Sequence, residues 1–136
     1  MITDEDLISG AARARQCAYA PYSHFPVGAA VLAGSGKVYT GVNVDNASFG
    51  LTICAERSAV FSAVAAGERE IQAVAVVTSI GAAPCGACRQ VLSEFAPKPG
   101  GLRAVRVIMA DSSGVSQACT LDELLPRAFN PSDLPG

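Results

Sequence analysis

The sequence predicts one α/β domain over residues 1–136, a three-layer α/β/α sandwich around a mixed five-stranded sheet. The length of 136 residues corresponds to a single domain. Segments with helical and strand-like patterns follow one another in the order α-β-β-α-β-α-β-β-α, which is typical of α/β proteins. Hydrophobic residues make up 50% of the chain, enough to form one substantial core.

The N-terminal part of the chain predicts a helix followed by a β-hairpin. Thr3 and Asp6 are typical of a helix N-cap with an acidic first turn, and Pro21 cannot continue the helix. The apolar residues of this helix recur at helical spacing: Leu7, Ala11, Ala14 and Ala18. Two apolar runs, residues 27–32 and 38–44, are separated by a Gly-Ser-Gly turn, so we expect them to pair as a hairpin.

The rest of the chain predicts three further helices and three further strands. Residues 54–66 have a helical pattern that stops at Gly67, and residues 71–78 are a nearly continuous Val and Ala run, typical of a strand covered on both faces. The other expected elements are a helix over 85–95, strands over 103–110 and 115–119, and a last short helix opened by a capping box of Thr120 and Glu123. The link over 111–114 is too short for a parallel crossover, so the last two strands should run antiparallel.

The charge pattern argues against a nucleic-acid polymer or a membrane as partner. The formal charge is −2 and no two Lys or Arg residues are adjacent, whereas a nucleic-acid footprint needs clustered basic residues. The N-terminus carries the acidic residues Asp4, Glu5 and Asp6 where a signal peptide would be basic and apolar, and no aliphatic run approaches the ~20 residues of a membrane helix. We therefore expect a cytoplasmic protein. Charged residues are only 16%, too few to coat a monomer, which favours a homo-oligomer.

Two cysteine motifs predict a catalytic zinc site. Cys85 and Cys88 lie three apart at a predicted helix start, so both can bind one ion. Cys54 and Glu56 can converge only if they straddle the N-terminus of another helix, where the predicted boundary falls. Three thiolates leave one zinc position for water, and a nearby carboxylate that is not a ligand is a general acid/base. Helix N-termini and Arg57 offset the negative charge of the thiolates.

Other interpretations of these cysteines stay open. Cys-x-x-Cys is also found in redox pairs, and it forms half of structural four-cysteine sites, which would here recruit Cys17 or Cys119. Cys17 lies on the apolar stripe of the first predicted helix and Cys119 ends a predicted strand, so we expect both to be buried small apolar residues. His24 lies in a predicted loop and is expected to be solvated.

The segments Cys54-Ala55-Glu56 and Pro84-Cys85-Gly86-Ala87-Cys88 resemble the three-cysteine signature of zinc-dependent nucleoside and nucleobase deaminases. Four further segments look like the small homotetrameric cytidine deaminases: residues 22–30, 41–46, 89–91 and 124–129. The resemblance extends from about residue 7 to residue 134. It implies hydrolysis of cytidine or 2′-deoxycytidine to the uracil nucleoside and ammonia, in pyrimidine salvage.

The resemblance also implies a role for individual residues. Cys54, Cys85 and Cys88 would hold one Zn²⁺ per subunit, with water as the fourth ligand, and Glu56 would move protons. The residues that it implies for substrate binding are Phe25 against the pyrimidine, Asn43 and Asp45 at the ribose, the backbone of Ala55 at the base edge, and Phe49 and Phe129 reaching a neighbouring subunit's site. Two positions depart from the family pattern, because Asp45 stands where Glu is usual and Phe49 where Tyr is common.

Three competing functions accompany this interpretation. One is a deaminase of another cytosine nucleoside, such as the antibiotic blasticidin S, which shares the zinc motif. Another is a non-catalytic, zinc-stapled interaction domain, which predicts a fourth protein ligand and gives Glu56 no task. A thiol oxidoreductase, the third, would depend on Cys85 without needing metal.

Overall fold

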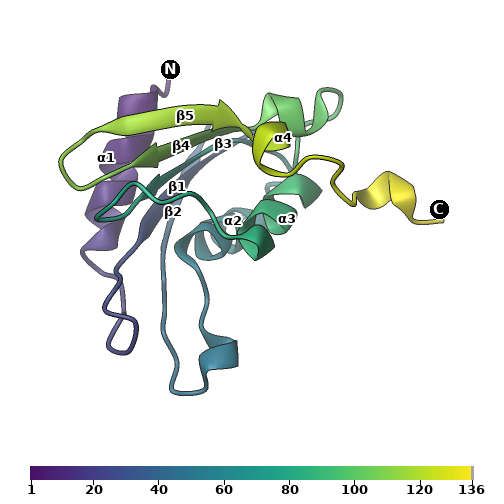
Figure 1. The fold of residues 1–136 in the computed structure, drawn as a ribbon. Helices are drawn as coiled ribbons and strands as arrows, with labels where there is room; N and C mark the ends of the chain where they lie inside the picture. The colour runs from purple at the N-terminus through teal and green to yellow at the C-terminus, as the bar shows by residue number, and fades with distance from the viewer. Residues whose placement is uncertain (136) are drawn as a thin grey trace.

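Five strands form one mixed sheet in the order β2-β1-β3-β4-β5 (Figure 1). The computed structural model describes residues 1–135, and Gly136 of the predicted domain lies outside the described residues. The strands are β1 (Gly28–Ala33), β2 (Val38–Val42), β3 (Ile71–Val77), β4 (Arg106–Ala110) and β5 (Ser116–Thr120). Only β3 and β4 pair in parallel, while β1 pairs antiparallel with β2 and β3, and β4 pairs antiparallel with β5. The mixed five-stranded sheet that the sequence predicts is confirmed.

Within residues 1–135, four α-helices accompany the sheet, in the predicted order along the chain. They are α1 (Asp4–Arg15), α2 (Ala55–Ala65), α3 (Gly86–Glu94) and α4 (Leu121–Leu124). Residues 1–135 also include three short 3₁₀ helices, of which η1 (Phe49–Leu51) and η2 (Gly101–Ala104) lie in connections and η3 (Pro131–Asp133) in the C-terminal segment. The glycine predicted to end α2 is present as Gly67, whose φ of +101° suits a helix terminus.

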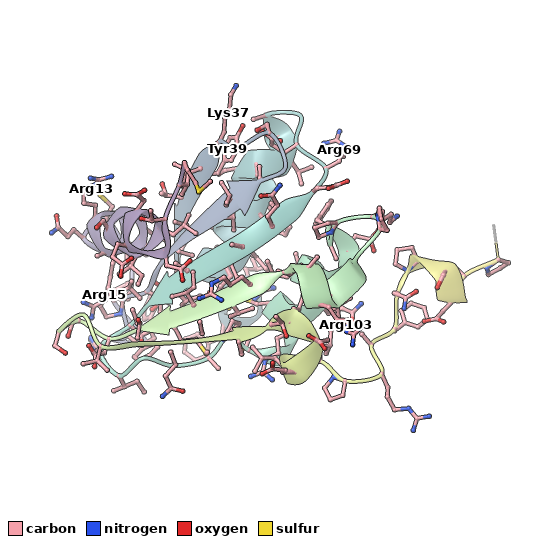
Figure 2. The ribbon with its side chains drawn as sticks, turned by 90° about the horizontal axis from the view of Figure 1, so that it is seen from above. Arg13, Arg15, Lys37, Tyr39, Arg69 and Arg103 are labelled. Carbon is pink, nitrogen blue, oxygen red and sulfur yellow. The ribbon has the colours of Figure 1, made fainter. Side chains whose placement is uncertain are left out.

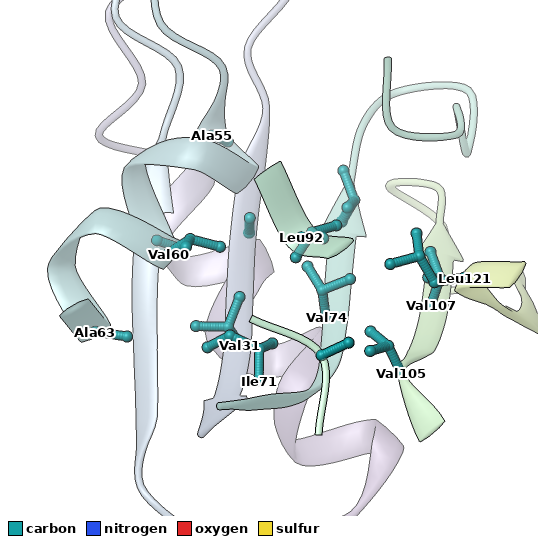
Figure 3. Packing of buried hydrophobic residues seen from close by; sticks show 14 of the residues in the cluster. Val31, Ala55, Val60, Ala63, Ile71, Val74, Leu92, Val105, Val107 and Leu121 are labelled. Carbon is teal, nitrogen blue, oxygen red and sulfur yellow. The ribbon is translucent and has the colours of Figure 1, made fainter. Parts of the chain in front are cut away.

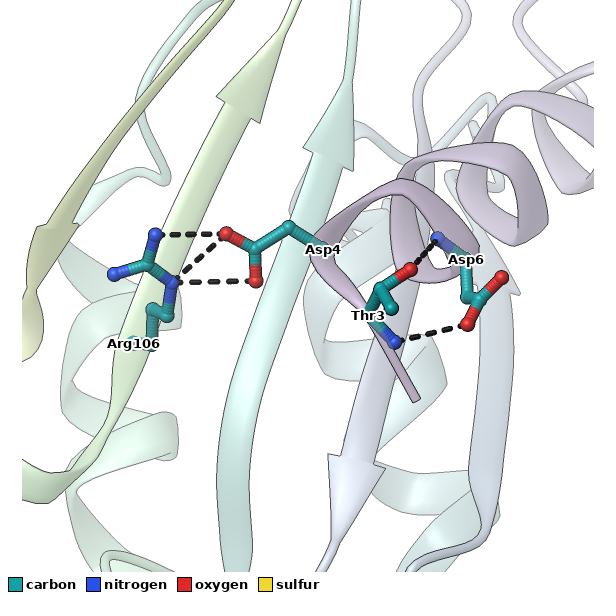
Figure 4. A network of polar contacts seen from close by, with 4 residues as sticks. All are labelled: Thr3, Asp4, Asp6 and Arg106. Atoms are coloured by element: carbon teal, nitrogen blue, oxygen red, sulfur yellow. Dashed lines mark hydrogen bonds and ion pairs between the residues drawn. The ribbon is translucent and has the colours of Figure 1, made fainter. Parts of the chain in front are cut away.

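The capping box predicted for α1 is confirmed (Figure 4). The Thr3 side chain accepts a hydrogen bond from the Asp6 N–H, and the Asp6 carboxylate accepts one from the Thr3 N–H. Beside this cap, Arg106 on β4 donates bidentately to Asp4, so the start of α1 is tied to the sheet.

α1 ends earlier than the sequence predicts. It stops at Arg15, well before Pro21, because the next N–H groups bond three residues back instead of four, which tightens the last turn. Cys17 therefore lies beyond the helix and is exposed, so its predicted burial on the apolar stripe is wrong. Cys119 is half-buried.

The core consists of two clusters of buried apolar residues on the two faces of the sheet. Val74 and Val76 of β3 face the cluster formed with α2 and α3, while Ala73 and Ala75 face the cluster under α1. β3 is thus covered on both faces, as its continuous apolar sequence predicts. Figure 3 labels the main members of the first cluster: Val31, Ala55, Val60, Ala63, Ile71, Val74, Leu92, Val105, Val107 and Leu121.

Two predicted boundaries are wrong near the C-terminal strands. The strand expected from residue 103 begins at Arg106, because η2 occupies the preceding residues. The capping box expected at Thr120 does not form: its hydroxyl donates to Asp122 and Glu123 instead of accepting a backbone N–H, and α4 is only four residues long. The Thr120 side chain therefore caps none of the first N–H groups of α4.

Basic side chains are dispersed over the molecule (Figure 2). Arg13 and Arg15 lie on α1, Lys37 and Arg69 at the hairpin end of the sheet, and Arg103 in η2. Among the described residues, no helix is long and apolar enough to cross a membrane.

Candidate active site

Three thiols converge where α2 and α3 begin. Cys54 is the N-cap of α2, Cys85 is the N-cap of α3, and Cys88 lies one turn into α3. All three Sγ atoms lie within 4.8 Å of one another. The Cys85 Sγ is 3.8 Å from that of Cys54 and 3.5 Å from that of Cys88. The structure thus brings together the three cysteines that the sequence predicts as ligands.

Both helices present their N-termini to the thiols. Cys54 and Cys85 each occupy an N-cap position, but neither side chain accepts a hydrogen bond from the N–H groups of its helix. Free N–H groups at two helix N-termini create a positive potential, which favours thiolate over thiol. The sequence predicts this arrangement from the position of Cys54-Ala55-Glu56 across a helix boundary.

Arg57 adds positive charge to the same group. Its Nη2 donates to the Cys54 Sγ at 3.2 Å, and its Nε is the one buried side-chain polar atom without a partner in residues 1–135. Hydrogen bonds from Cys88 and then from Arg57 lower the pKa of Cys54 to about 5, against the opposing effect of burial. The pKa of Cys88 is raised because that thiol donates to Cys54 and is buried. The hydrogen bond from Arg57 thus favours a thiolate on Cys54.

Glu56 is the buried acid of the site. It lies in the first turn of α2, is only 5% exposed, and lines the same cavity as Cys54 and Cys85. Burial raises the pKa of its carboxyl group, and the Cys54 thiolate adds to that effect. A carboxyl group in this environment gains and loses a proton more readily near neutral pH than an exposed one, as general acid/base chemistry requires.

The cavity beside Glu56 has a volume of about 220 Å³. Phe25, Asn43, Asp45 and Ala55 line it together with Glu56 and two of the three thiols, so the structure brings four of the six predicted substrate-binding residues to one place. The sequence did not predict the remaining walls, which are formed by Ser23, Val27, Thr52, Ile53, Val76, Thr78, Ala82 and Ala83.

Phe49 and Phe129 lie outside this cavity. Phe49, 75% exposed, packs its ring 6.2 Å from that of Tyr22 and lines a neighbouring hollow of about 350 Å³. Phe129, 57% exposed, belongs to the C-terminal segment, which Gln90 anchors by donating to the Phe129 carbonyl. Within one chain neither ring reaches the thiols.

The side chain of Asn43 is occupied by the backbone of residues 25–27. Its Oδ1 accepts from the Val27 N–H at 2.9 Å and its Nδ2 donates to the Phe25 carbonyl at 2.8 Å. Asn43 therefore holds Phe25 at the cavity in addition to facing the cavity itself.

Replacing Asn43 by Asp is expected to destabilise the protein by about 1–3 kcal/mol, because a carboxylate oxygen then faces the Phe25 carbonyl without a proton. Urea unfolding measures the loss. Asn46→Asp is the matched control, since exposed Asn46 uses only its Oδ1, as acceptor from the Ser48 N–H. Equal unfolding free energies for the two variants would contradict the anchoring role.

Asp45 is held from the preceding loop. Its Oδ2 accepts from the Ser23 N–H at 2.8 Å and the Tyr22 N–H at 3.2 Å. The bond from Ser23 is the main reason why the pKa of the buried Asp45 carboxyl lies below its ordinary value of 3.8. The sequence offered no signal for this contact, because the partners are backbone groups of a distant loop.

Replacing Asp45 by Asn is expected to make the free energy of unfolding depend less on pH below pH 6. A lowered pKa in the folded state means that the carboxylate stabilises the protein above about pH 4 and loses this effect as the pH falls through the folded-state value. The difference between parent and variant should therefore shrink from pH 6 to pH 2, measured by denaturant unfolding of metal-free protein. Parallel curves over this interval would contradict the prediction.

Comparisons with known proteins agree with this geometry. A family model described as the cytidine and deoxycytidylate deaminase zinc-binding region matches residues 1–99. A cytidine deaminase from Halalkalibacterium halodurans is 47% identical over 130 residues, covering 94% of this chain and 95% of the relative, and one from Sporosarcina psychrophila is 45% identical over 132 residues, covering 96% and 93%.

Solved structures agree as well. The crystal structure of cytidine deaminase from Burkholderia pseudomallei matches with a TM-score of 0.86 and 48% identity, covering 94% of this chain and 100% of that one. The family model spans more than half of the chain, and these relatives match it almost from end to end. The chain belongs to the cytidine and deoxycytidylate deaminase family.

Proposed function

We propose that this chain is a zinc-dependent cytidine deaminase that hydrolyses cytidine and 2′-deoxycytidine to uridine and 2′-deoxyuridine, releasing ammonia. One observation carries the proposal: a cavity lined by Asn43, Asp45 and the buried Glu56 is also lined by Cys54 and Cys85, two members of a group of three closely spaced thiols. An interaction domain stabilised by zinc does not explain why the buried Glu56 lies at a cavity beside the thiols. A thiol oxidoreductase requires neither Glu56 nor the cavity.

The donor set fits zinc. Three sulfurs within 4.8 Å are the soft, closely grouped ligands that Zn²⁺ prefers, and the unspent donor of Arg57 beside them offsets their negative charge. Cys54, Cys85 and Cys88 hold the ion. A set of three protein ligands leaves a position for water, as in catalytic sites. Bound zinc supplies Lewis acidity, which brings the pKa of water to about 7.

Glu56 moves the protons. As water adds to C4 of the cytosine ring, the Glu56 carboxylate accepts a proton from it and passes this proton to N3. Glu56 then accepts the second proton of the water and delivers it to the amino group at C4, which leaves as ammonia. Its raised pKa, caused by burial, suits a group that must both take and give a proton in one cycle.

The remaining cavity residues bind and orient the nucleoside. Phe25 packs against the pyrimidine, and the free N–H of Ala55 at the start of α2 donates to the base edge. Asn43 and the Asp45 carboxylate form hydrogen bonds with the sugar hydroxyls. The N–H groups of Ser23 and Tyr22 both donate to the Oδ2 of Asp45, so its Oδ1 is free to accept from the ligand. The side chain of Asp45 is one methylene shorter than that of Glu, so its hydrogen bond to the sugar hydroxyl is longer or passes through a water molecule.

The charge of the cavity favours a nucleoside over a nucleotide. Its fifteen lining residues include the acids Asp45 and Glu56 but no Lys, Arg or His. A phosphate group would meet negative charge without a basic partner, whereas neutral hydroxyls find acceptors.

Three measurements on the purified protein test the proposal: zinc per chain, ammonia release from cytidine and 2′-deoxycytidine, and ammonia release from blasticidin S and deoxycytidylate. We expect one zinc per chain, turnover of the two nucleosides, and loss of turnover when a chelator removes the metal. Turnover of blasticidin S alone would make the antibiotic the substrate. Zinc without turnover of any compound would support the interaction domain.

A homotetramer is the assembly that we propose. Phe49 and Phe129, the two predicted residues outside the cavity, are large exposed rings, and Tyr22 and Leu51 are exposed close to Phe49. A second copy covering this apolar surface would bring a ring to the mouth of the cavity. Sedimentation paired with activity tests this: a stable monomer with full activity would contradict it.

Two broader assignments follow from the same family. We propose that the protein acts in pyrimidine salvage and that it is cytoplasmic. The odd number of cysteines and their free state support the cytoplasmic location, because disulfides are rare in that compartment. We also propose that the fold is a three-layer α/β/α sandwich, because α1 contributes to one core cluster and α2 and α3 to the other (Figure 1).

A further inference from the structure

Arg89 joins the start of α3 to the end of α4. Its Nε donates to the Pro84 carbonyl at 2.7 Å, and its Nη1 donates to the Leu124 carbonyl at 2.8 Å. Pro84 directly precedes Cys85, and Leu124 is the last residue of α4. One guanidinium therefore connects the chain before a thiol of the site to the C-terminal part of the fold.

Both carbonyls depend on this side chain. Pro84 is buried, and the carbonyl of Leu124 is one of the helix-terminal acceptors that have no partner within the helix. Arginine suits the task because its N–H groups form a rigid planar fork that reaches two acceptors at once, whereas the ammonium of lysine is a single point.

The main chain of Arg89 holds the other side of Cys85. The Arg89 N–H donates to the Cys85 carbonyl at 3.0 Å, so one residue fixes the carbonyl before Cys85 and the carbonyl of Cys85 itself. With both peptide groups fixed, the Cα–Cβ bond of Cys85 keeps its direction. This backbone places the Cys85 Sγ, which lies 3.8 Å from that of Cys54 and 3.5 Å from that of Cys88.

We propose that Arg89 is a positioning residue for the metal site: by clamping the backbone around Cys85 to the end of α4, it holds the Cys85 sulfur in the geometry that retains the ion. The inference rests on the proposed function only in that Cys85 is a zinc ligand. Partners that orient metal ligands typically contribute 10–100-fold to metal affinity. The C-terminal segment after β5 is thus part of the support of the metal site.

Neighbouring residues offer matched comparisons. Gln90, the next residue of α3, donates to the Phe129 carbonyl at 2.9 Å and so anchors the C-terminal segment without contacting Pro84 or Cys85. Arg103, exposed in η2, carries the same charge as Arg89 elsewhere on the molecule (Figure 2). Arg89→Met keeps most of the aliphatic stem and removes the fork.

The test is the rate of zinc release to a chromogenic chelator at 25 °C from zinc-loaded protein. We expect Arg89→Met to release zinc about 10–100-fold faster than the parent, and Gln90→Ala and Arg103→Met to stay within about twofold of it. Arg89→Lys reaches only one of the two carbonyls, so its rate of zinc release should lie between those of the parent and of Arg89→Met. This variant replaces Arg89→Met in the test if the Met variant does not fold. The KM for cytidine of the zinc-replete variants should change little, since no residue at the sugar is touched.

Two results would overturn the inference. One is zinc release from both Arg89 variants within twofold of the parent, even with a lower Tm, which would make Arg89 a purely structural link. The other is equal acceleration by Gln90→Ala, which would assign the effect to the C-terminal segment as a whole. If the parent protein binds zinc but does not deaminate cytidine, the proposed function is contradicted. The rates of zinc release still test the role of Arg89, because they require only zinc-loaded protein.

Discussion

Replacing Glu56 by Gln is expected to lower kcat for cytidine by about 10²–10⁴-fold while zinc content stays at the parental level. The amide keeps the size and shape of the side chain in a site where it is 5% exposed, so packing is preserved. What is lost is the exchange of a proton, which no other side chain of the cavity can take over, because its only other acid, Asp45, is held by Ser23 and Tyr22.

Steady-state kinetics and metal analysis of the same samples measure this effect. Glu94→Gln is the control, because Glu94 is an exposed acid on α3 away from the cavity, and its kcat should equal that of the parent. A Glu56→Gln variant that retained more than a tenth of parental kcat would exclude Glu56 as the proton carrier. Loss of zinc together with activity would instead place Glu56 among the groups that build the metal site.

The chemical centre could be predicted from local sequence because its determinants are local. The position of Cys54 and Glu56 across a helix start follows from the helical pattern that begins there, and Cys85 and Cys88 share a helix face by spacing alone. The burial of β3 on both faces follows equally from its unbroken Val and Ala run.

The surroundings of that centre depend on contacts between distant segments. Asp45 is held by backbone N–H groups of residues 22 and 23, and Arg89 caps the last carbonyl of α4, and neither pairing leaves a pattern along the chain. The exposure of Cys17 has the same origin, since a change of hydrogen bonding in one turn decides it. Local patterns predict which elements form, whereas long-range backbone contacts decide how the site is supported.

Gly41 shows how such a contact supports the catalytic helix. It lies in β2 opposite Ala29, and a Cβ placed on it would lie 2.3 Å from the Ala59 nitrogen and 2.6 Å from the Ala55 carbonyl oxygen. Both atoms belong to the backbone of α2, so no side-chain rotation can relieve the overlap. β2 and α2 approach this closely only because residue 41 has no side chain.

Gly41→Ala is therefore expected to lower the free energy of unfolding by roughly 2–4 kcal/mol, at the upper end of what overpacking costs. The strain acts on the first turn of α2, which follows the N-cap Cys54 and carries Glu56, so zinc affinity should fall with stability. Denaturant unfolding and metal analysis measure both effects. Gly50→Ala is the matched control, because a Cβ at Gly50 meets no atom within 4 Å. Equal stability of the two variants would show that α2 can move away from β2 at little cost, and a retained zinc site would show that the metal centre tolerates that movement.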